Sequence, residues 1–143
     1  MEILNIKKDN IIALNWFIDH KGYIMQLPSD PIMTNHGEFR LHTRAKGIFK
    51  PRWSKFALSI KILIDSPYND QLKDKENDNW TLLYNQEGDD EDFWTNTSLK
   101  RNMYQGFPVG VLFQVNEDPS LYKIFGLGKV LDYNDGKFSI ESL

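Results

Sequence analysis

Apolar and polar residues alternate along several short stretches of this chain, a pattern typical of half-buried β-strands. In the clearest stretch, residues 57–64, leucine and isoleucine occupy the even positions, while Ser59, Lys61 and Leu63 face the opposite way. A shorter strand is predicted around residues 38–43. Further strands are predicted for residues 80–84, 109–115, 121–133 and 137–143.

One stretch near the start has the spacing of an amphipathic helix. It covers residues 10–21, where Asp9 or Asn10 could cap the first turn and Gly22 follows the last. Its apolar face is predicted to contain Ile11, Leu14, Phe17 and Ile18.

A second, shorter helix is predicted before the 109–115 strand. Either Thr95 or Asn96 could cap its first turn, because each side chain can accept a hydrogen bond from a free N–H group. Leu99 and Met103 lie four residues apart and would give this helix an apolar edge. The glycine at position 106 can adopt the left-handed turn that ends a helix.

The order of these elements predicts an α+β fold, in which a curled, mainly antiparallel sheet forms a partial β-barrel with two short helices. Gly126 and Gly128 predict a bulge or bend in the 121–133 strand, and Asn-Asp-Gly at 134–136 predicts a hairpin turn. At 143 residues the chain is expected to be one domain, 1–143, with the 10–21 helix as an extension.

Composition narrows the class of protein without naming a function. The chain is 26% charged, has a net charge of −3 and contains no cysteine, which excludes disulfides and thiolate chemistry. Its three histidines match no metal-ligand spacing, so neither a metal nor a cofactor is expected. We see no signal-peptide pattern and no apolar run of about 20 residues, and therefore expect a cytoplasmic protein without a membrane partner.

Positive charge is concentrated in one segment of this acidic chain. Between residues 44 and 55 the cations alternate with the aromatic residues Phe49 and Trp53, a pattern suited to nucleic acid because cations bind phosphates and flat rings stack on bases. The other interpretation is that the two rings fill the core beneath a solvated loop of mixed charge.

Polar side chains also gather where the 80–84 strand ends. Tyr84 is followed by Asn85, Gln86 and Glu87, and an aromatic ring beside polar groups at a strand end is typical of a recognition site. The other interpretation is that Tyr84 and Tyr68 pack as ordinary strand-end aromatics.

Two long stretches resemble a known family. TNTSLKRNMYQGFPVGVLFQV and YKIFGLGKVLDYNDGKFSI resemble the second half of the SET- and RING-associated (SRA) domain, a member of the PUA-like superfamily. Together with GIFKPRWSKFALSI, DSPY and YNQEG, they resemble the amino-terminal domain of bacterial HNH restriction endonucleases. The likeness covers about residues 44–140.

The resemblance implies a sensor that binds double-stranded DNA and flips out a modified base, most typically a modified cytosine, between Tyr68 and Tyr84. Flipping costs a few kcal/mol, and stacking on aromatic rings returns about 1–3 kcal/mol per base. The base edge would be read by Asp70 or Gln71, with Asn85 and Gln86 adding polar contacts. The DNA backbone would be held by Arg44, Lys46, Lys50, Arg52, Lys55, Asn96, Lys100 and Arg101.

Two other classes of function stay open at this point. By resemblance the nuclease would lie on a further domain or subunit, so we expect a binding domain and not an enzyme. One alternative is an RNA-binding PUA-like module that stacks an unpaired base. The other is a metal-dependent nuclease that uses Asp70, Glu87 and the acidic run 89–92 as ligands.

Overall fold

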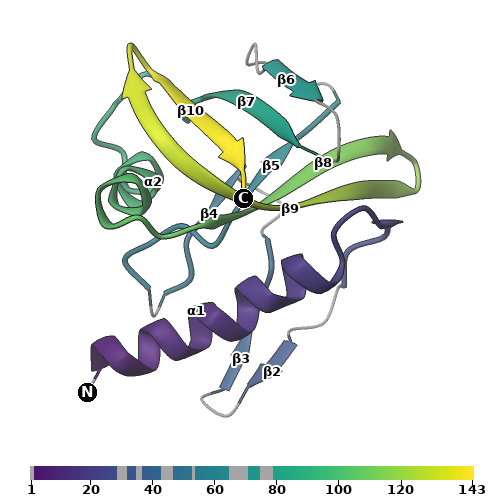
Figure 1. Ribbon diagram of the computed structural model, residues 1–143, viewed down its shortest axis with the longest axis horizontal. Coiled ribbons are helices and arrows are strands. Elements are labelled where there is room, and N and C mark those ends of the chain that lie inside the picture. Colours follow the sequence, from purple (N-terminus) through teal and green to yellow (C-terminus); the bar gives the residue numbers. More distant parts are fainter. Residues whose placement is uncertain are drawn as a thin grey trace.

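Most strands of the computed structural model form one curled, mostly antiparallel sheet with a helix against each face (Figure 1). The structure describes residues 2–28, 32–34, 37–42, 47–52, 54–64, 71–74 and 79–143, and it describes side chains for 11–28, 32, 40–42, 47–52, 54–64 and 79–143. The elements are α1 (Glu2–Asp19), β1 (Ile24–Met25), β2 (Ile32–Thr34), β3 (Gly37–Phe39), β4 (Ile48–Phe49), β5 (Ser59–Ile62), β6 (Gln71–Asp74), β7 (Trp80–Asn85), α2 (Trp94–Gln105), β8 (Val109–Glu117), β9 (Ser120–Asn134) and β10 (Lys137–Ser142).

The main sheet has the order β4-β5-β8-β9-β10-β7-β6, and β1 pairs with β9. Neighbouring strands are antiparallel except β5 and β8, which run parallel with Ser59 opposite Gly110. Strands β2 and β3 form a separate two-stranded ribbon. The chain therefore has the predicted α+β class, with a mostly antiparallel half-barrel and two helices.

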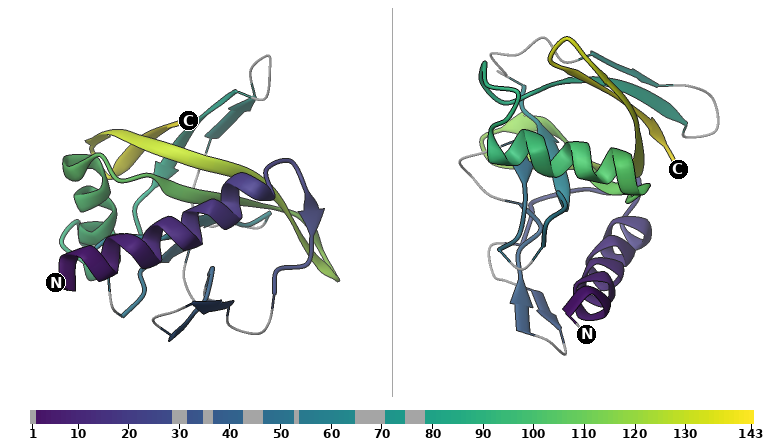
Figure 2. Two further views of the ribbon diagram at one scale, coloured as in Figure 1. Left: turned by 60° about the horizontal axis from the view of Figure 1, so that its bottom comes forward. Right: turned by 90° about the vertical axis from the view of Figure 1, so that its left-hand side faces the viewer.

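Each face of the sheet has its own apolar cluster. Inside the curl, side chains from β4, β5 and β7–β10 pack with Leu99 of α2. On the opposite face, α1 packs Ala13, Leu14 and Phe17 against β8 and β9. Figure 2 shows the two helices on different sides of the sheet. In the part of the chain described here, neither helix is long and apolar enough to cross a membrane.

The predicted start of α1 was wrong. The helix begins at Glu2 and not near residue 10, because no proline or glycine interrupts residues 2–9 and the cap candidates Asp9 and Asn10 are tolerated inside the helix. Its face also differs: Ile11 and Ile18 are each 55% exposed, whereas the Phe17 ring is fully buried. The ring fits because it lies over Gly110, where a Cβ would overlap it.

The predicted end of α2 was right and its predicted cap was wrong. Gly106 has the left-handed φ of 67° and its N–H reaches back to the last turn, as expected. At the start the N-cap residue is Phe93, which makes no side-chain cap, while Thr95 and Asn96 lie within the helix and are buried. Burial of Leu99 confirms the predicted apolar edge.

The strand predictions hold in outline. Gly126 has a φ of 84° and lies at a register shift between β8 and β9, which confirms the bulge. Asp135 and Gly136 both have positive φ and close the predicted β9–β10 hairpin. The strand predicted for 57–64 is shorter, at Ser59–Ile62, and Ile64 beyond its end is 47% exposed.

Candidate nucleic-acid interface

The Tyr84 ring lies in the protein core and offers no face to a base. It is 4% exposed and belongs to the cluster inside the curled sheet. Its hydroxyl donates to the carbonyl of Lys61 at 3.4 Å and lies against Gly47. The alternation along β7 places Trp80, Leu82 and Tyr84 on this inner face. The prediction of an accessible stacking ring at Tyr84 was therefore wrong for this structure, and the packing interpretation holds.

The structure describes only some of the other predicted base contacts. Tyr68 and Asp70 lie outside the described residues, and Gln71 is described only by its backbone, which pairs with Leu83. Asn85 is half-buried at the end of β7.

Gln86 is committed to contacts within the protein. Its Oε1 accepts a hydrogen bond from the Tyr133 hydroxyl, and its Nε2 donates to the carbonyl of Gly88 at 3.2 Å. Burial, followed by the nearby charge of Glu91, raises the pKa of Tyr133, so this phenol stays protonated and remains a donor at neutral pH. Gln86 thus ties the turn after β7 to the β9–β10 hairpin and is not available to read a base edge in this arrangement.

A partly buried hydrogen-bond network holds the turn after β7 in place. Glu87 Oε1 accepts from the backbone N–H of Ile48 at 2.7 Å, across 39 residues of sequence. Asn96 Oδ1 accepts from the Glu87 N–H at 2.8 Å, while Asn96 Nδ2 donates to the carbonyls of Glu87 and Asp90. Asn96 has no exposed surface, so its predicted contact with the DNA backbone was wrong. Its amide instead fixes the 87–90 turn against α2.

A second buried asparagine, Asn102, fixes neighbouring loops against the other end of α2. The Asn102 side chain exchanges hydrogen bonds with both backbone groups of Ala57, at 2.8 and 2.9 Å. Its Nδ2 also lies 3.3 Å from the carbonyl oxygen of Phe107 and 3.4 Å from that of Pro108. This residue therefore joins the loop before β5 to the turn between α2 and β8.

These two asparagines and Glu87 were missed as organising residues by the sequence analysis. Asn96 and Asn102 lie six apart in a helix that otherwise looks polar, and spacing alone does not tell a buried amide from an exposed one. The available signal was that all three fall inside the stretches that carry the family resemblance, YNQEG and TNTSL through GFPVGVL.

Cations from two distant segments meet on one surface. The guanidinium of Arg101 on α2 donates to the Lys55 carbonyl at 3.5 Å, across 46 residues of sequence. Burial, followed by repulsion from Arg101, lowers the pKa of Lys50. Arg52 and Lys55 are exposed in the same loop between β4 and β5. We call Lys50, Arg52, Lys55 and Arg101 the basic patch.

Of three further predicted backbone contacts, the structure describes only Lys100. Arg44 and Lys46 lie outside the described residues. Lys100 points elsewhere: its Nζ donates to the Glu91 carbonyl at 3.0 Å and lies 4.4 Å from the centre of the Tyr133 ring. Of the two aromatic residues in the loop, Phe49 packs against the α1-side core, as the core interpretation expected, and Trp53 is not described.

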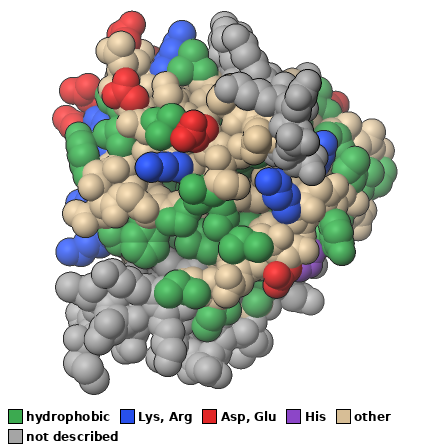
Figure 3. All heavy atoms as spheres, viewed as in Figure 1, with side chains coloured by type: hydrophobic (Ala, Val, Ile, Leu, Met, Phe, Trp, Pro, Cys, Tyr) green, Lys and Arg blue, Asp and Glu red, His purple; other side chains and the backbone are tan. Residues whose placement is uncertain are grey.

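Acidic groups occupy a neighbouring part of the surface. Figure 3 shows acidic side chains at its upper left, on the side where Figure 1 places α2 and the β9–β10 hairpin. Residues 89–92 are exposed. Within the described ranges, no three His, Cys, Asp or Glu side chains are grouped closely enough to hold a metal ion.

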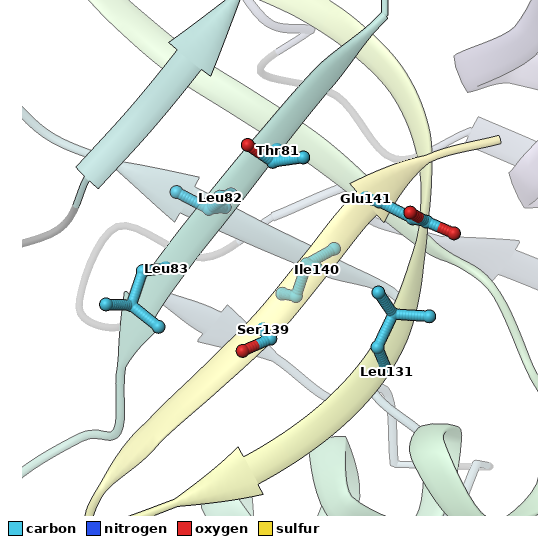
Figure 4. A pocket seen from close by; sticks show the side chains of 7 residues that line it. All are labelled: Thr81, Leu82, Leu83, Leu131, Ser139, Ile140 and Glu141. Carbon is cyan, nitrogen blue, oxygen red and sulfur yellow. The ribbon is translucent and has the colours of Figure 1, made fainter.

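A shallow groove of about 270 Å³ lies on the outer face of β7, β9 and β10 (Figure 4). It is lined by Thr81, Leu82 and Leu83 of β7, by Leu131 of β9, and by Ser139, Ile140 and Glu141 of β10. Tyr84 points to the opposite face of β7, so this groove is not the predicted tyrosine pocket.

Comparison with known proteins gives no independent identification. No protein family and no curated protein matches this chain.

Proposed function

We propose that this chain is a DNA-binding module of the SRA-like, PUA-like kind, which recognises a modified base in duplex DNA on behalf of an HNH-type restriction endonuclease. The coarse fold supports it, because a curled, mostly antiparallel half-barrel with two helices is the architecture that the resemblance implies. A modified cytosine is the first candidate for the base.

The basic patch is the observation that carries the proposal. Three of its four cations are supplied by the β4–β5 loop and the fourth by α2, so the fold adds the charge of Arg101 to a segment that is already basic in the sequence. Holding Lys50 and Arg101 close together costs free energy through repulsion, and the phosphates of a DNA backbone would relieve that cost. Phosphates would also replace the water lost around the half-buried Lys50 ammonium.

The network around the patch supports the same function. Glu87, Asn96 and Asn102 connect the GIFK, YNQEG, TNTSL and GFPVGVL stretches through hydrogen bonds. Buried amides that satisfy several backbone groups hold a surface in one arrangement, as a phosphate-binding surface requires. The fixed shape of the loop would then set the register of the protein on the duplex.

Recognition of the modified base is proposed from the resemblance alone. The Tyr84 ring is excluded as a stacking surface in this arrangement. Tyr68, with Asp70 or Gln71 at the base edge, is therefore the part of the implied pocket that the proposal retains.

The experiment is a fluorescence-anisotropy titration of one duplex sequence carrying cytosine, 5-methylcytosine, 5-hydroxymethylcytosine or its glucosylated form, and of the same sequence as RNA. A modification sensor binds at least one modified duplex about tenfold or more tightly than the plain duplex, a difference of about 1.4 kcal/mol. Equal affinity for all duplexes would refute the sensor, and tighter binding of RNA would favour the RNA-binding alternative.

Arg101→Ala is the variant that tests the basic patch, and Lys129→Ala is its matched control, because Lys129 is an exposed cation on β9, a strand that supplies no residue of the patch. Arg101→Ala should weaken binding of plain and modified duplexes alike and reduce the salt slope by about one. If the two variants behave identically, the patch does not contact the backbone.

A further inference from the structure

The outward side of α2 carries two exposed aromatic rings with a cation between them. Trp94 is 48% exposed and Tyr104 is 73% exposed, whereas Leu99 and Asn102 on the opposite side of the helix are buried. Arg101 follows Trp94 by seven residues and precedes Tyr104 by three, spacings that place side chains on one side of a helix. In the right-hand view of Figure 2, α2 lies at the front of the molecule. We call Trp94, Arg101 and Tyr104 the aromatic face.

The aromatic face is continuous with the basic patch. Arg101 belongs to both, because its guanidinium extends from α2 to the Lys55 carbonyl at 3.5 Å. Tyr104 lies one helical turn beyond Arg101, so its ring stands at the positively charged end of the face. Lys50 and Arg52 extend the positive charge along the loop between β4 and β5. The fold thus assembles an aromatic surface edged by cations from two segments of the chain.

Charge changes sign along this side of the molecule. The acidic residues 89–92 precede Trp94 and are exposed, whereas the cations of the basic patch lie toward the other end of α2. A polyanion is therefore attracted to the end of the face that holds Arg101 and Tyr104, and it is repelled beyond Trp94. The negative groups of a ligand belong at Arg101 and Lys55, and Trp94 marks the limit of the surface that such a ligand can follow.

Aromatic rings beside cations suit a nucleic acid whose bases are unpaired. Cations bind the phosphates, and the rings stack on the flat faces of the bases. Within a continuous duplex each base is covered by its neighbours in the stack, so a ring on a convex helix cannot reach a base face. In a single strand the bases can turn out and stack on protein rings instead. An acidic peptide would satisfy the cations but would leave the two rings without flat partners, so the surface favours single-stranded nucleic acid.

The separation of the rings fits a short stretch of such a strand. Trp94 and Tyr104 are ten residues apart in one helix, which corresponds to about 15 Å along its axis. Bases stacked along one strand repeat every ~3.4 Å, so the two rings would bracket about four nucleotides. Arg101 lies between the rings, where it can contact a phosphate of the same stretch.

We propose that the aromatic face binds a short single-stranded segment of DNA, with bases stacked on Tyr104 and Trp94 and phosphates on Arg101 and Lys55. The inference rests on the proposed function only in that both use the basic patch as the phosphate-binding surface. It requires no modified base and no pocket for a flipped base.

The test is a fluorescence-anisotropy titration of the full chain with five probes of matched length: oligodeoxythymidine, the same strand without bases, a blunt duplex, oligouridine and polyglutamate. Oligodeoxythymidine should bind about tenfold or more tightly than the strand without bases, because the two carry the same phosphates and only the first offers flat faces for stacking. Equal affinity for these two strands would overturn the proposal, as would tighter binding of polyglutamate or of oligouridine.

Tyr104→Leu removes the ring but keeps an apolar side chain. Its matched control is Tyr23→Leu, because Tyr23 is 57% exposed in the segment between α1 and β1. Tyr104→Leu should weaken binding of oligodeoxythymidine by about fivefold or more and leave duplex affinity unchanged, while Tyr104→Phe and the control bind both probes normally. If circular dichroism shows that Tyr104→Leu does not fold, Trp94→Leu is the deciding variant. A folded variant that keeps full affinity for oligodeoxythymidine, or loses affinity for the duplex to the same extent, would overturn the proposal.

Failure of the proposed function would give a different pattern from failure of this inference. Arg101→Ala should weaken binding of strand and duplex together, because both place phosphates on that cation. If plain and modified duplexes bind equally while Tyr104→Leu still weakens only the single strand, the sensor proposal fails and the single-strand site stands. If modified duplexes are preferred while Tyr104→Leu changes nothing, the reverse holds.

Discussion

Replacing Asn102 with alanine should cost about 3 kcal/mol of unfolding free energy. The side chain is 1% exposed and accepts from the Ala57 N–H at 2.8 Å while donating to the Ala57 carbonyl at 2.9 Å. Leaving a buried N–H unsatisfied costs about 1–3 kcal/mol, and each lost hydrogen bond adds about 1 kcal/mol. For 143 residues, at about 2.1 cal/mol/K of unfolding entropy per residue, this corresponds to a fall in Tm of about 10 °C.

The measurement is urea and thermal unfolding followed by circular dichroism, with Gln105→Ala as the control. Gln105 lies three residues further along the same helix and is exposed, so its replacement should change stability by no more than about 0.5 kcal/mol. The unfolding free energy of Asn102→Asp should lie between those of Asn102→Ala and Gln105→Ala. The aspartate keeps the acceptor for the Ala57 N–H but loses the donors and adds a buried charge. If Asn102→Ala is as stable as the control, the hydrogen bonds of Asn102 do not stabilise the contact between α2 and the loop before β5.

Three further outcomes follow from contacts described above. Gly110→Ala should destabilise the fold by about 2–3 kcal/mol because the added methyl overlaps the Phe17 ring, and Phe17→Leu in the same chain should recover part of the loss in urea unfolding. Tyr84→Phe should cost no more than about 1 kcal/mol, since its hydrogen bond is 3.4 Å long, whereas Tyr84→Ala should cost about 3–5 kcal/mol; near-native stability of Tyr84→Ala would contradict the core position. The folded-state pKa of Tyr133 is raised above its ordinary value of 10.0, so its contribution to stability is fully present below that value and is lost as pH rises above it. Tyr133→Phe should therefore flatten the alkaline part of the stability profile, and an unchanged profile would count against this assignment.

The strands and turns could be predicted because side-chain alternation and turn-forming residues depend only on neighbours in the sequence. The alternation in 80–84, the left-handed Gly106 and the Asp135-Gly136 turn each depend on neighbours in sequence, and each was found where expected. The position of α1 was less well predicted, since Asp9 and Asn10 are common cap residues and residue type alone does not tell a cap from a position inside a helix.

The candidate site was harder to predict because alternation tells which residues share a face but not what covers that face. Tyr84 and Lys61 illustrate the problem in opposite ways. Tyr84 was expected to be accessible, yet the curl of the sheet encloses it. Lys61 was expected on a polar face, yet the segment after β1 and Tyr122 enclose it as well. Both outcomes depend on contacts between residues far apart in sequence.

The parallel pairing of β5 with β8 has a consequence for how the molecule assembles. Strands β8, β9 and β10 follow one another through short turns, so their pairing involves little loop entropy. Ser59 meets Gly110 only after about fifty intervening residues have been brought into a closed loop, which makes docking of β4 and β5 the slower event. Lys50 and Lys55 arrive with that late-docking segment, whereas Arg101 belongs to the helix that precedes β8. Nascent or partly unfolded chains would therefore lack the complete basic patch. Their affinity for polyanions should be lower than that of the folded protein.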